Sequence, residues 1–276
     1  MEVPNLFDNE DIIKKEGIFY DMLNREYHGS DGISSTQFQD LDLSVSVFNN
    51  RHIFSTEKGC YNEGDLNHVS LLEPDKLDMF LESTTKGFET IATKKLIEDN
   101  PGKTIVTMGS IDLAAERAKK VFLIFGKYLN SSKKEVSIIV WDESIQMYRK
   151  ARTDIWLQDN GIILDYKTSK EDTVKGFESC IEKYNYHLSA AWYMDTVNMA
   201  IEKFKLPFPK IHTFGWIVSP HTAPHKPFGM ICSDELLEKG RDKYTFRLDK
   251  LIQVNQNGEK DYLFHDAHSW EYRRDQ

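Results

Sequence analysis

An Asn-Gly pair at positions 160 and 161 separates two segments whose composition is typical of β-strands. Asn-Gly is favoured in two-residue hairpin turns, because both central residues of such a turn have positive φ. The sequence therefore predicts that a strand over about 147–157 turns back directly into a strand over 162–168. This hairpin is the local feature that most constrains the fold.

The predicted turn also determines which residues face one another. It pairs Asp154 with Lys167 and Trp156 with Asp165, and side-chain alternation places all four on one face of the sheet. Diagonal neighbours in such a pair lie roughly 7–8 Å apart at Cα, so both carboxylates can reach one divalent ion. Mg²⁺ and Mn²⁺ prefer oxygen ligands of this kind. With a lysine to orient or deprotonate water, the set is suited to phosphodiester hydrolysis.

The triplet Asp165-Tyr166-Lys167 is the only Asp/Glu-x-Lys in the chain. A second interpretation is equally compatible with the local pattern. Asp154 and Lys167 can form an exposed cross-strand ion pair that contributes under about 1 kcal/mol. The hairpin alone therefore leaves a metal site and an ordinary ion pair both open.

The remaining pattern predicts an α/β or α+β core. Further β-rich segments lie at 135–141, 211–218 and 227–232, and helical periodicity is present at 110–129, 173–185 and 187–204. We predict one domain over residues 1–276, with a mainly helical part over 1–130. The catalytic sheet with its flanking helices is expected over 131–276.

Composition excludes several classes of protein. The chain has 35 basic and 44 acidic residues and a net charge of −9, which argues against a protein that coats nucleic acid through bulk charge. An enzyme that grips DNA in one basic channel remains compatible with this charge. No run of about 18 apolar residues is present, so no membrane span is expected. The first residues lack a secretion signal, and three widely spaced cysteines suggest reduced thiols, so we expect a cytoplasmic protein.

Several motifs together resemble a known family. Arg149–Asp154 followed by Ile162–Thr168 resembles the R-P-D … D-x-K-T core of the PD-(D/E)XK nucleases, and more narrowly the RecE-type exonucleases of the exodeoxyribonuclease VIII family. Three other segments agree in order: Gly32–Phe38 with G-I-S-x-S, Gly64–Pro74 with a helix whose histidine precedes L-L-E-P, and Tyr184–Tyr193 with Y-x-x-Q-x-x-x-Y. The resemblance implies a restriction-endonuclease-like core, in which helices flank a central mixed sheet.

The resemblance also implies roles for particular residues. Asp154 and Asp165 would be metal ligands, the carbonyl of Tyr166 would complete the shell, and Lys167 would be the catalytic lysine. His68 would approach the metal or the departing phosphate, and Glu135 would complete the metal site. For His68 the alternative is a hydrogen-bonded core histidine. For Glu135 the alternative is an exposed glutamate at a strand edge.

Two positions depart from the family pattern. Thr153 replaces the proline of R-P-D, which matters little because the position needs only an extended backbone. Ser189 replaces the glutamine of the following helix and is too short for the same substrate contact. Tyr193 retains the family tyrosine, either as a DNA contact or as a packing aromatic.

Candidate DNA contacts follow from the alternation and from a helix start. Lys150 and Arg152 are expected on the face of Asp154, with Arg152 as the better phosphate clamp. Ser34 and Thr36 lie at a helix start whose free N–H groups can hold a phosphate. The capping-box spacing from Ser34 to Gln37 also fits ordinary capping.

The function implied by the resemblance is a Mg²⁺-dependent exonuclease, with Mn²⁺ also suitable. It would digest one strand of linear double-stranded DNA from its 5′ ends and leave 3′ overhangs for recombination. A ring-forming homo-oligomer and a RecT-type single-strand annealing partner are implied as well. The alternatives are a RecB- or Cas4-like single-strand exonuclease, an endonuclease, or a catalytically silent protein that binds DNA ends.

Overall fold

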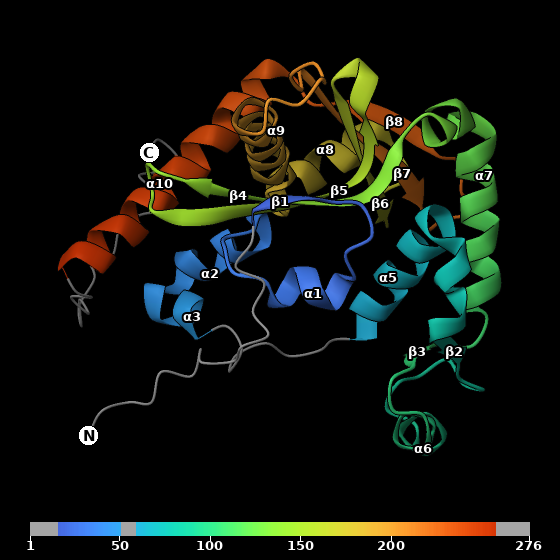
Figure 1. Ribbon diagram of the computed structural model, residues 1–276. Coiled ribbons are helices and arrows are strands. Elements are labelled where there is room, and N and C mark those ends of the chain that lie inside the picture. Colours follow the sequence, from blue (N-terminus) through green and yellow to red (C-terminus); the bar gives the residue numbers. More distant parts are fainter. Residues whose placement is uncertain (1–15, 51–58, 258–276) are drawn as a thin grey trace, which may run out of the picture.

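The computed structural model describes residues 16–50 and 59–257, and a six-stranded mixed sheet forms its centre (Figure 1). The strand order is β1-β4-β5-β6-β7-β8. Only β6 and β7 pair in parallel, and the other neighbours are antiparallel. The strands are β1 Gly17–Phe19, β4 Lys133–Asp142, β5 Met147–Leu157, β6 Ile162–Ser169, β7 Thr213–Pro220 and β8 Phe228–Ile231. The predicted fold class, a central mixed sheet flanked by helices, is confirmed.

Helices cover both faces of the sheet (Figure 1). In that view α8, α9 and α10 lie above the sheet, α1 and α5 lie below it, and α7 stands at one side. The pair β2–β3 and helix α6 project away from the sheet. The bounds are α1 Asn24–Gly29, α2 Phe38–Leu43, α3 Val45–Asn49, α5 Gly59–Leu72, β2 Phe80–Glu82, α6 Ile91–Asp99, β3 Thr104–Val106, α7 Ser110–Asn130, α8 Val174–Lys183, α9 Tyr186–Lys203 and α10 Asp234–Asn257.

The sheet separates two apolar cores. The larger core joins the sheet to α8, α9 and α10, and Trp156, Trp192 and Trp216 are almost fully buried in it. The smaller core packs Ile155 and Tyr166 against α5 and α7. Each large apolar side chain that is buried in this way stabilises the fold by about 1.5–3 kcal/mol. These two cores fix α9 and α5 on opposite sides of the strands that carry the predicted site.

The hairpin forms as predicted, but its turn is longer than two residues. Gln158–Asn160 make a 3₁₀ turn and Gly161 adopts the left-handed conformation at φ 62°. The strands therefore pair Leu157 with Ile162 and Ile155 with Leu164. The predicted register was wrong by two residues, because a four-residue loop replaces the two-residue turn. A shift of two would by itself keep each side chain on its face. The predicted grouping of faces was nevertheless wrong, because Trp156 packs in the core with α9, whereas Lys150 bonds to the carbonyl oxygens of Tyr27 and Ser30 at α1, on the opposite side of the sheet.

Gly161→Ala is expected to destabilise the fold by about 1–3 kcal/mol. Its φ is positive, and an added Cβ would lie 2.5 Å from the carbonyl oxygen of Lys210. Urea unfolding monitored by circular dichroism measures the change. Gly109→Ala is the matched control, because its φ is also positive at 85° but nothing lies within 4 Å of the added Cβ. Equal losses in the two variants would show that the close approach to Lys210 costs nothing.

The described residues before 131 are mainly helical, and they also contribute the strands β1, β2 and β3. The three residues of β1 pair with β4 at an edge of the main sheet, which no periodicity in so short a segment indicated. The prediction of one domain with a boundary near residue 130 stays a prediction. No helix within 16–50 and 59–257 is long and apolar enough to cross a membrane.

Candidate metal centre and active site

Asp154 lies at the point where β5 and β6 separate. The paired residues of these strands end at Ile155 and Leu164, one step before Asp154. Beyond that step a side chain replaces the backbone hydrogen bonding between the two strands. Oδ2 of Asp154 accepts a hydrogen bond from the backbone N–H of Tyr166 at 2.7 Å. The carboxylate of Asp154 is therefore buried in a gap between two strands and held in a fixed orientation.

Glu135 faces Asp154 across the β4–β5 pair. Lys134 pairs with Ile155 and Val136 pairs with Thr153, so Glu135 lies opposite Asp154. Its φ is 51°, in the left-handed region that non-glycine residues rarely occupy. The alternative of an exposed strand-edge glutamate does not hold, because its side chain is only 14% exposed and is bonded to Arg152.

His68 approaches the same point from α5, below the sheet. Its Nδ1 lies 3.5 Å from Oδ2 of Asp154, and its ring packs against Tyr166 with 5.3 Å between centroids. One ligand atom each from His68, Glu135 and Asp154 lie within 4.8 Å of one another. The position of His68 beside Asp154 fits a residue of the predicted site better than the alternative of a hydrogen-bonded core histidine. The described residues thus bring together three of the predicted metal ligands.

Asp165 and Lys167 form a second group beside the first. Oδ2 of Asp165 lies 2.6 Å from Nζ of Lys167, whose ammonium also lies 5.4 Å from the ring centroid of Tyr186 on α9. The predicted cross-strand pairing of Lys167 with Asp154 was wrong, because the longer turn moves the register. Asp165 is not one of the three residues that converge within 4.8 Å. Its role as a metal ligand, like that of the Tyr166 carbonyl, stays a prediction.

Burial and mutual repulsion perturb these ionisable groups. Burial, followed by the charge of Asp165, raises the pKa of Asp154 to about 7. Burial and the charge of Asp154 raise the pKa of Glu135 to about 7. Burial alone would lower the pKa of the Lys167 ammonium, but Asp165 and Asp154 outweigh burial and raise it above its ordinary value. Buried carboxylates that repel one another are the charge distribution that a bound cation would relieve.

The neutral form of His68 is favoured. Burial lowers the pKa of this imidazole, and the charge of Lys167 lowers it further. A neutral imidazole is the form that binds a metal ion. Two carboxylates and one neutral imidazole within ligand distance of a common point fit a divalent cation such as Mn²⁺ or Mg²⁺. The donor set is consistent with a divalent cation without identifying it.

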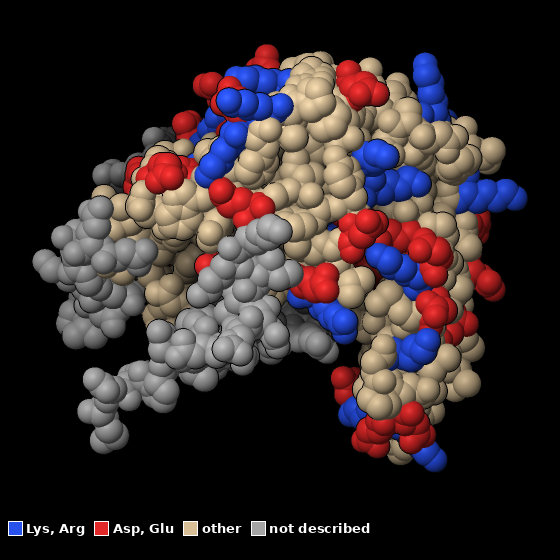
Figure 2. Space-filling model, viewed as in Figure 1, with Lys and Arg blue, Asp and Glu red and all other residues tan. Residues whose placement is uncertain are grey.

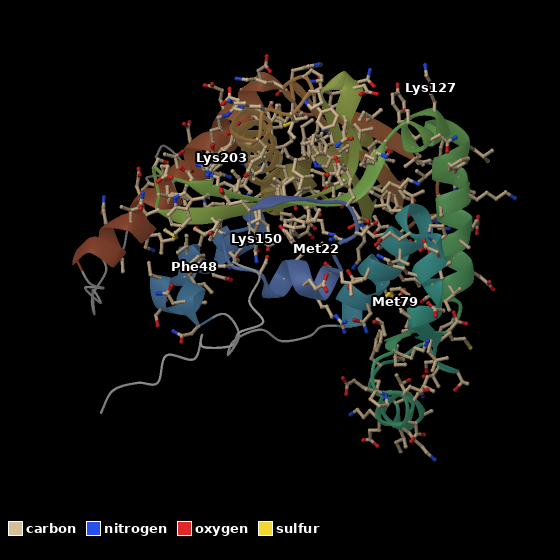
Figure 3. All side chains as sticks on the ribbon, viewed as in Figure 1. Met22, Phe48, Met79, Lys127, Lys150 and Lys203 are labelled. Carbon is tan, nitrogen blue, oxygen red and sulfur yellow. The ribbon has the colours of Figure 1, made fainter. Side chains whose placement is uncertain are left out.

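Two of the predicted DNA contacts are turned into the protein. Nζ of Lys150 donates to the carbonyl oxygens of Ser30 at 2.6 Å and Tyr27 at 3.1 Å. Figure 3 labels Lys150 and Met22 below the sheet, and the Met22 carbonyl accepts from Arg152 at 2.9 Å. Both basic side chains are buried, with 4% of Lys150 and 8% of Arg152 exposed. This geometry contradicts phosphate-clamp roles, because sheet alternation directs the charges onto α1 and Glu135.

The remaining predicted DNA contacts lie near the site. Ser34 is the N-cap residue of a helical turn. Its backbone N–H donates to Oε1 of Gln37 at 2.7 Å, and its hydroxyl lies 3.1 Å from the hydroxyl of Thr36. The helical turn that follows has only three residues, Ser35–Gln37, and leads into α2. Capping therefore accounts for Ser34 and Thr36, and phosphate binding there stays an untested prediction.

Tyr193 on α9 lies close to the carboxylates. Burial raises the pKa of its phenol above its ordinary value, and the charges of Asp165 and Asp154 raise it further. The ring also contacts Phe214 of the main core with 6.4 Å between centroids. Tyr193 thus packs in the core while its phenol is sensitive to the charges of the site, and a contact with DNA stays a prediction.

Tyr186 is a site residue that the sequence analysis did not single out. It begins α9 and lies seven residues before Tyr193, so both fall on the same side of that helix. Its ring contacts the Lys167 ammonium. The seven-residue spacing of two tyrosines after the predicted catalytic strand was the signal that could have found it.

The mixed sheet, with carboxylates on β5 and β6 and a lysine two residues after Asp165, defines a PDDEXK-like class of protein. The family described as "PDDEXK-like domain of unknown function (DUF3799)" matches residues 45–263, so the chain belongs to this family. A crystal structure of a candidate exonuclease from Eubacterium rectale superposes with a TM-score of 0.56 at 15% identity, covering 90% of this chain and 96% of that chain. At this identity the likeness supports the fold alone. No curated protein matches the sequence.

Proposed function

We propose that the protein is a metal-dependent deoxyribonuclease. The convergence of His68, Glu135 and Asp154 within 4.8 Å, beside the Asp165–Lys167 pair, carries this proposal. Membership of a PDDEXK-like family supports it. The RecE-type motifs add the finer proposal of a 5′→3′ exonuclease that acts on linear double-stranded DNA and leaves 3′ overhangs for recombination.

Each residue of the site has a distinct part in this proposal. The metal would be held by His68, Glu135 and Asp154. Asp165 would be an additional ligand. A bound Mg²⁺ would polarise the phosphate and lower the pKa of a water ligand. Lys167 presents a fixed ammonium that orients the attacking water or the scissile phosphate. The contacts with the Tyr186 ring and with the Asp165 carboxylate hold this ammonium in place.

The proposal includes partners that only the family resemblance implies. These are a ring-forming homo-oligomer and a RecT-type annealing protein, in a cytoplasmic setting. On the face shown in Figure 2, basic and acidic side chains are interspersed over the region of α5, α7 and α6. We therefore expect any basic DNA channel to lie on another face or between subunits.

Three DNA substrates test the proposal. The protein is incubated with end-labelled linear duplex, closed circular duplex and single strands, each with Mg²⁺ or with EDTA. We expect digestion of the linear duplex only, beginning at phosphorylated 5′ ends, and none with EDTA. Cutting of closed circles would identify an endonuclease instead, and digestion of single strands alone would identify a RecB-like enzyme. End binding without any cutting would identify a silent DNA-end-binding protein.

A further inference from the structure

Arg152 is a buried arginine whose bonds all reach neighbouring segments of the chain. Its Nε donates to Oε2 of Glu135 at 2.6 Å, and its Nη1 donates to Oγ of Ser137 at 2.7 Å and to the carbonyl of Met22 at 2.9 Å. These contacts link β5 to β4 and to the segment that follows β1. Only 9% of the Arg152 side chain is exposed.

Glu135 needs such a partner for two reasons. Its left-handed φ of 51° is a strained conformation for a residue with a side chain, at a cost of about 1–3 kcal/mol. Its carboxylate also lies opposite that of Asp154, and the two repel one another in a buried setting. Without a fixed cation beside it, the Glu135 side chain would turn away from Asp154.

The geometry of the contact requires a guanidinium. The rigid planar group has donors on separate nitrogens, so Nε can hold Glu135 while Nη1 is anchored on Ser137 and Met22. A lysine ammonium in the same place would be a single point and could not span these acceptors in a fixed plane. The two anchors therefore determine where the bond to Glu135 points.

We infer that Arg152 is a positioning residue that holds the Glu135 carboxylate in the metal centre and sets the affinity of that centre for a divalent cation. The inference rests on the proposed function only in requiring that His68, Glu135 and Asp154 bind a metal. Arg152 acts through Glu135 and has no separate part in holding the ion. Residues that orient a metal ligand typically change metal affinity by about 10–100-fold when they are replaced.

A double-mutant cycle on the full chain tests this inference, with Mn²⁺ alone as the probe. Isothermal titration with MnCl₂ is carried out on the wild type, Arg152→Met, Glu135→Ala and the double variant. We expect Arg152→Met to weaken Mn²⁺ binding by about 10-fold or more, and to add nothing to the loss caused by Glu135→Ala. A further loss in the double variant would overturn the inference, because Arg152 would then act independently of Glu135.

Milder variants guard against misfolding. Ser137→Ala removes one anchor of Arg152 and leaves Glu135 and Arg152 in place, so it should weaken Mn²⁺ binding by a few fold. Arg152→Lys keeps the positive charge but loses the planar set of donors. Its Mn²⁺ affinity should lie between that of the wild type and that of Arg152→Met. An unchanged Mn²⁺ affinity in folded Arg152→Lys and Ser137→Ala would overturn the inference.

Arg149→Met is the matched control for a purely structural role. Arg149 lies on the same strand, is similarly buried, and bonds to Asp142 at 2.5 Å, but it faces Trp192 and not the metal centre. The Arg149→Met substitution should lower thermal stability without changing the Mn²⁺ affinity. A loss of affinity equal to that of Arg152→Met would contradict the inference. A wild type that binds no Mn²⁺ would overturn the proposed metal centre as well, which separates the two failures.

Discussion

Asp154→Asn is expected to reduce Mg²⁺-dependent cleavage of linear duplex DNA by roughly 10³-fold, while the protein remains folded. The amide oxygen of asparagine can still accept the Tyr166 N–H, so the junction between β5 and β6 keeps its hydrogen bond. What is lost is a negative charge within ligand distance of His68 and Glu135. Metal catalysis contributes several kcal/mol, and a loss of about 4 kcal/mol corresponds to a factor of roughly 10³.

The measurement is a single-turnover cleavage rate at saturating Mg²⁺, with circular dichroism as a check on folding. Asp159→Asn serves as the control, because Asp159 is an exposed carboxylate in the loop of the same hairpin. That variant should cleave at the wild-type rate. If Asp154→Asn retained more than about a tenth of the wild-type rate, the assignment of Asp154 as a metal ligand would be wrong.

The hairpin and its chemistry were predictable because they depend on short-range rules. Strand composition, an Asn-Gly turn and period-two alternation locate Asp154 and Asp165 on adjacent strands. The turn length was not predictable, because the 3₁₀ conformation of Gln158–Asn160 depends on packing against the rest of the chain. At Gly161, for example, an added Cβ would lie 2.5 Å from the Lys210 carbonyl oxygen, so only glycine fits. The error changed which residues pair, and the alternation along β5 also failed, since Trp156 faces α9 whereas Arg152 bonds to the Met22 carbonyl on the other side.

Longer-range features of the site had weaker signals. Alternation correctly put Arg152 on the face of Asp154, but it could not show that this face is covered by α1 and the segment around Met22. Basic side chains are usually exposed, so a phosphate contact was the reasonable prediction. The left-handed Glu135 had no signal in residue type, because glycine or asparagine is the usual residue at such a φ. His68 was found only through the resemblance of its segment to a family motif.

Lys167→Met is expected to slow the chemical step by about 10²–10³-fold without weakening metal binding. The Lys167 ammonium lies 2.6 Å from the carboxylate of Asp165, a candidate metal ligand. Methionine fills a similar volume and can still pack on the Tyr186 ring, so the substitution removes mainly the charge. Because Asp165 then lacks its counter-ion, the affinity for a cation should stay the same or increase.

This opposite response of rate and affinity distinguishes Lys167 from the metal ligands. Single-turnover rates give the first quantity and Mn²⁺ titration gives the second, on the same protein preparation. Lys170→Met is the matched control, since Lys170 is exposed just beyond the end of β6 and should leave both unchanged. A Lys167→Met variant that lost metal affinity in parallel with its cleavage rate would mean that Lys167 supports the architecture of the metal centre and does not act on the substrate.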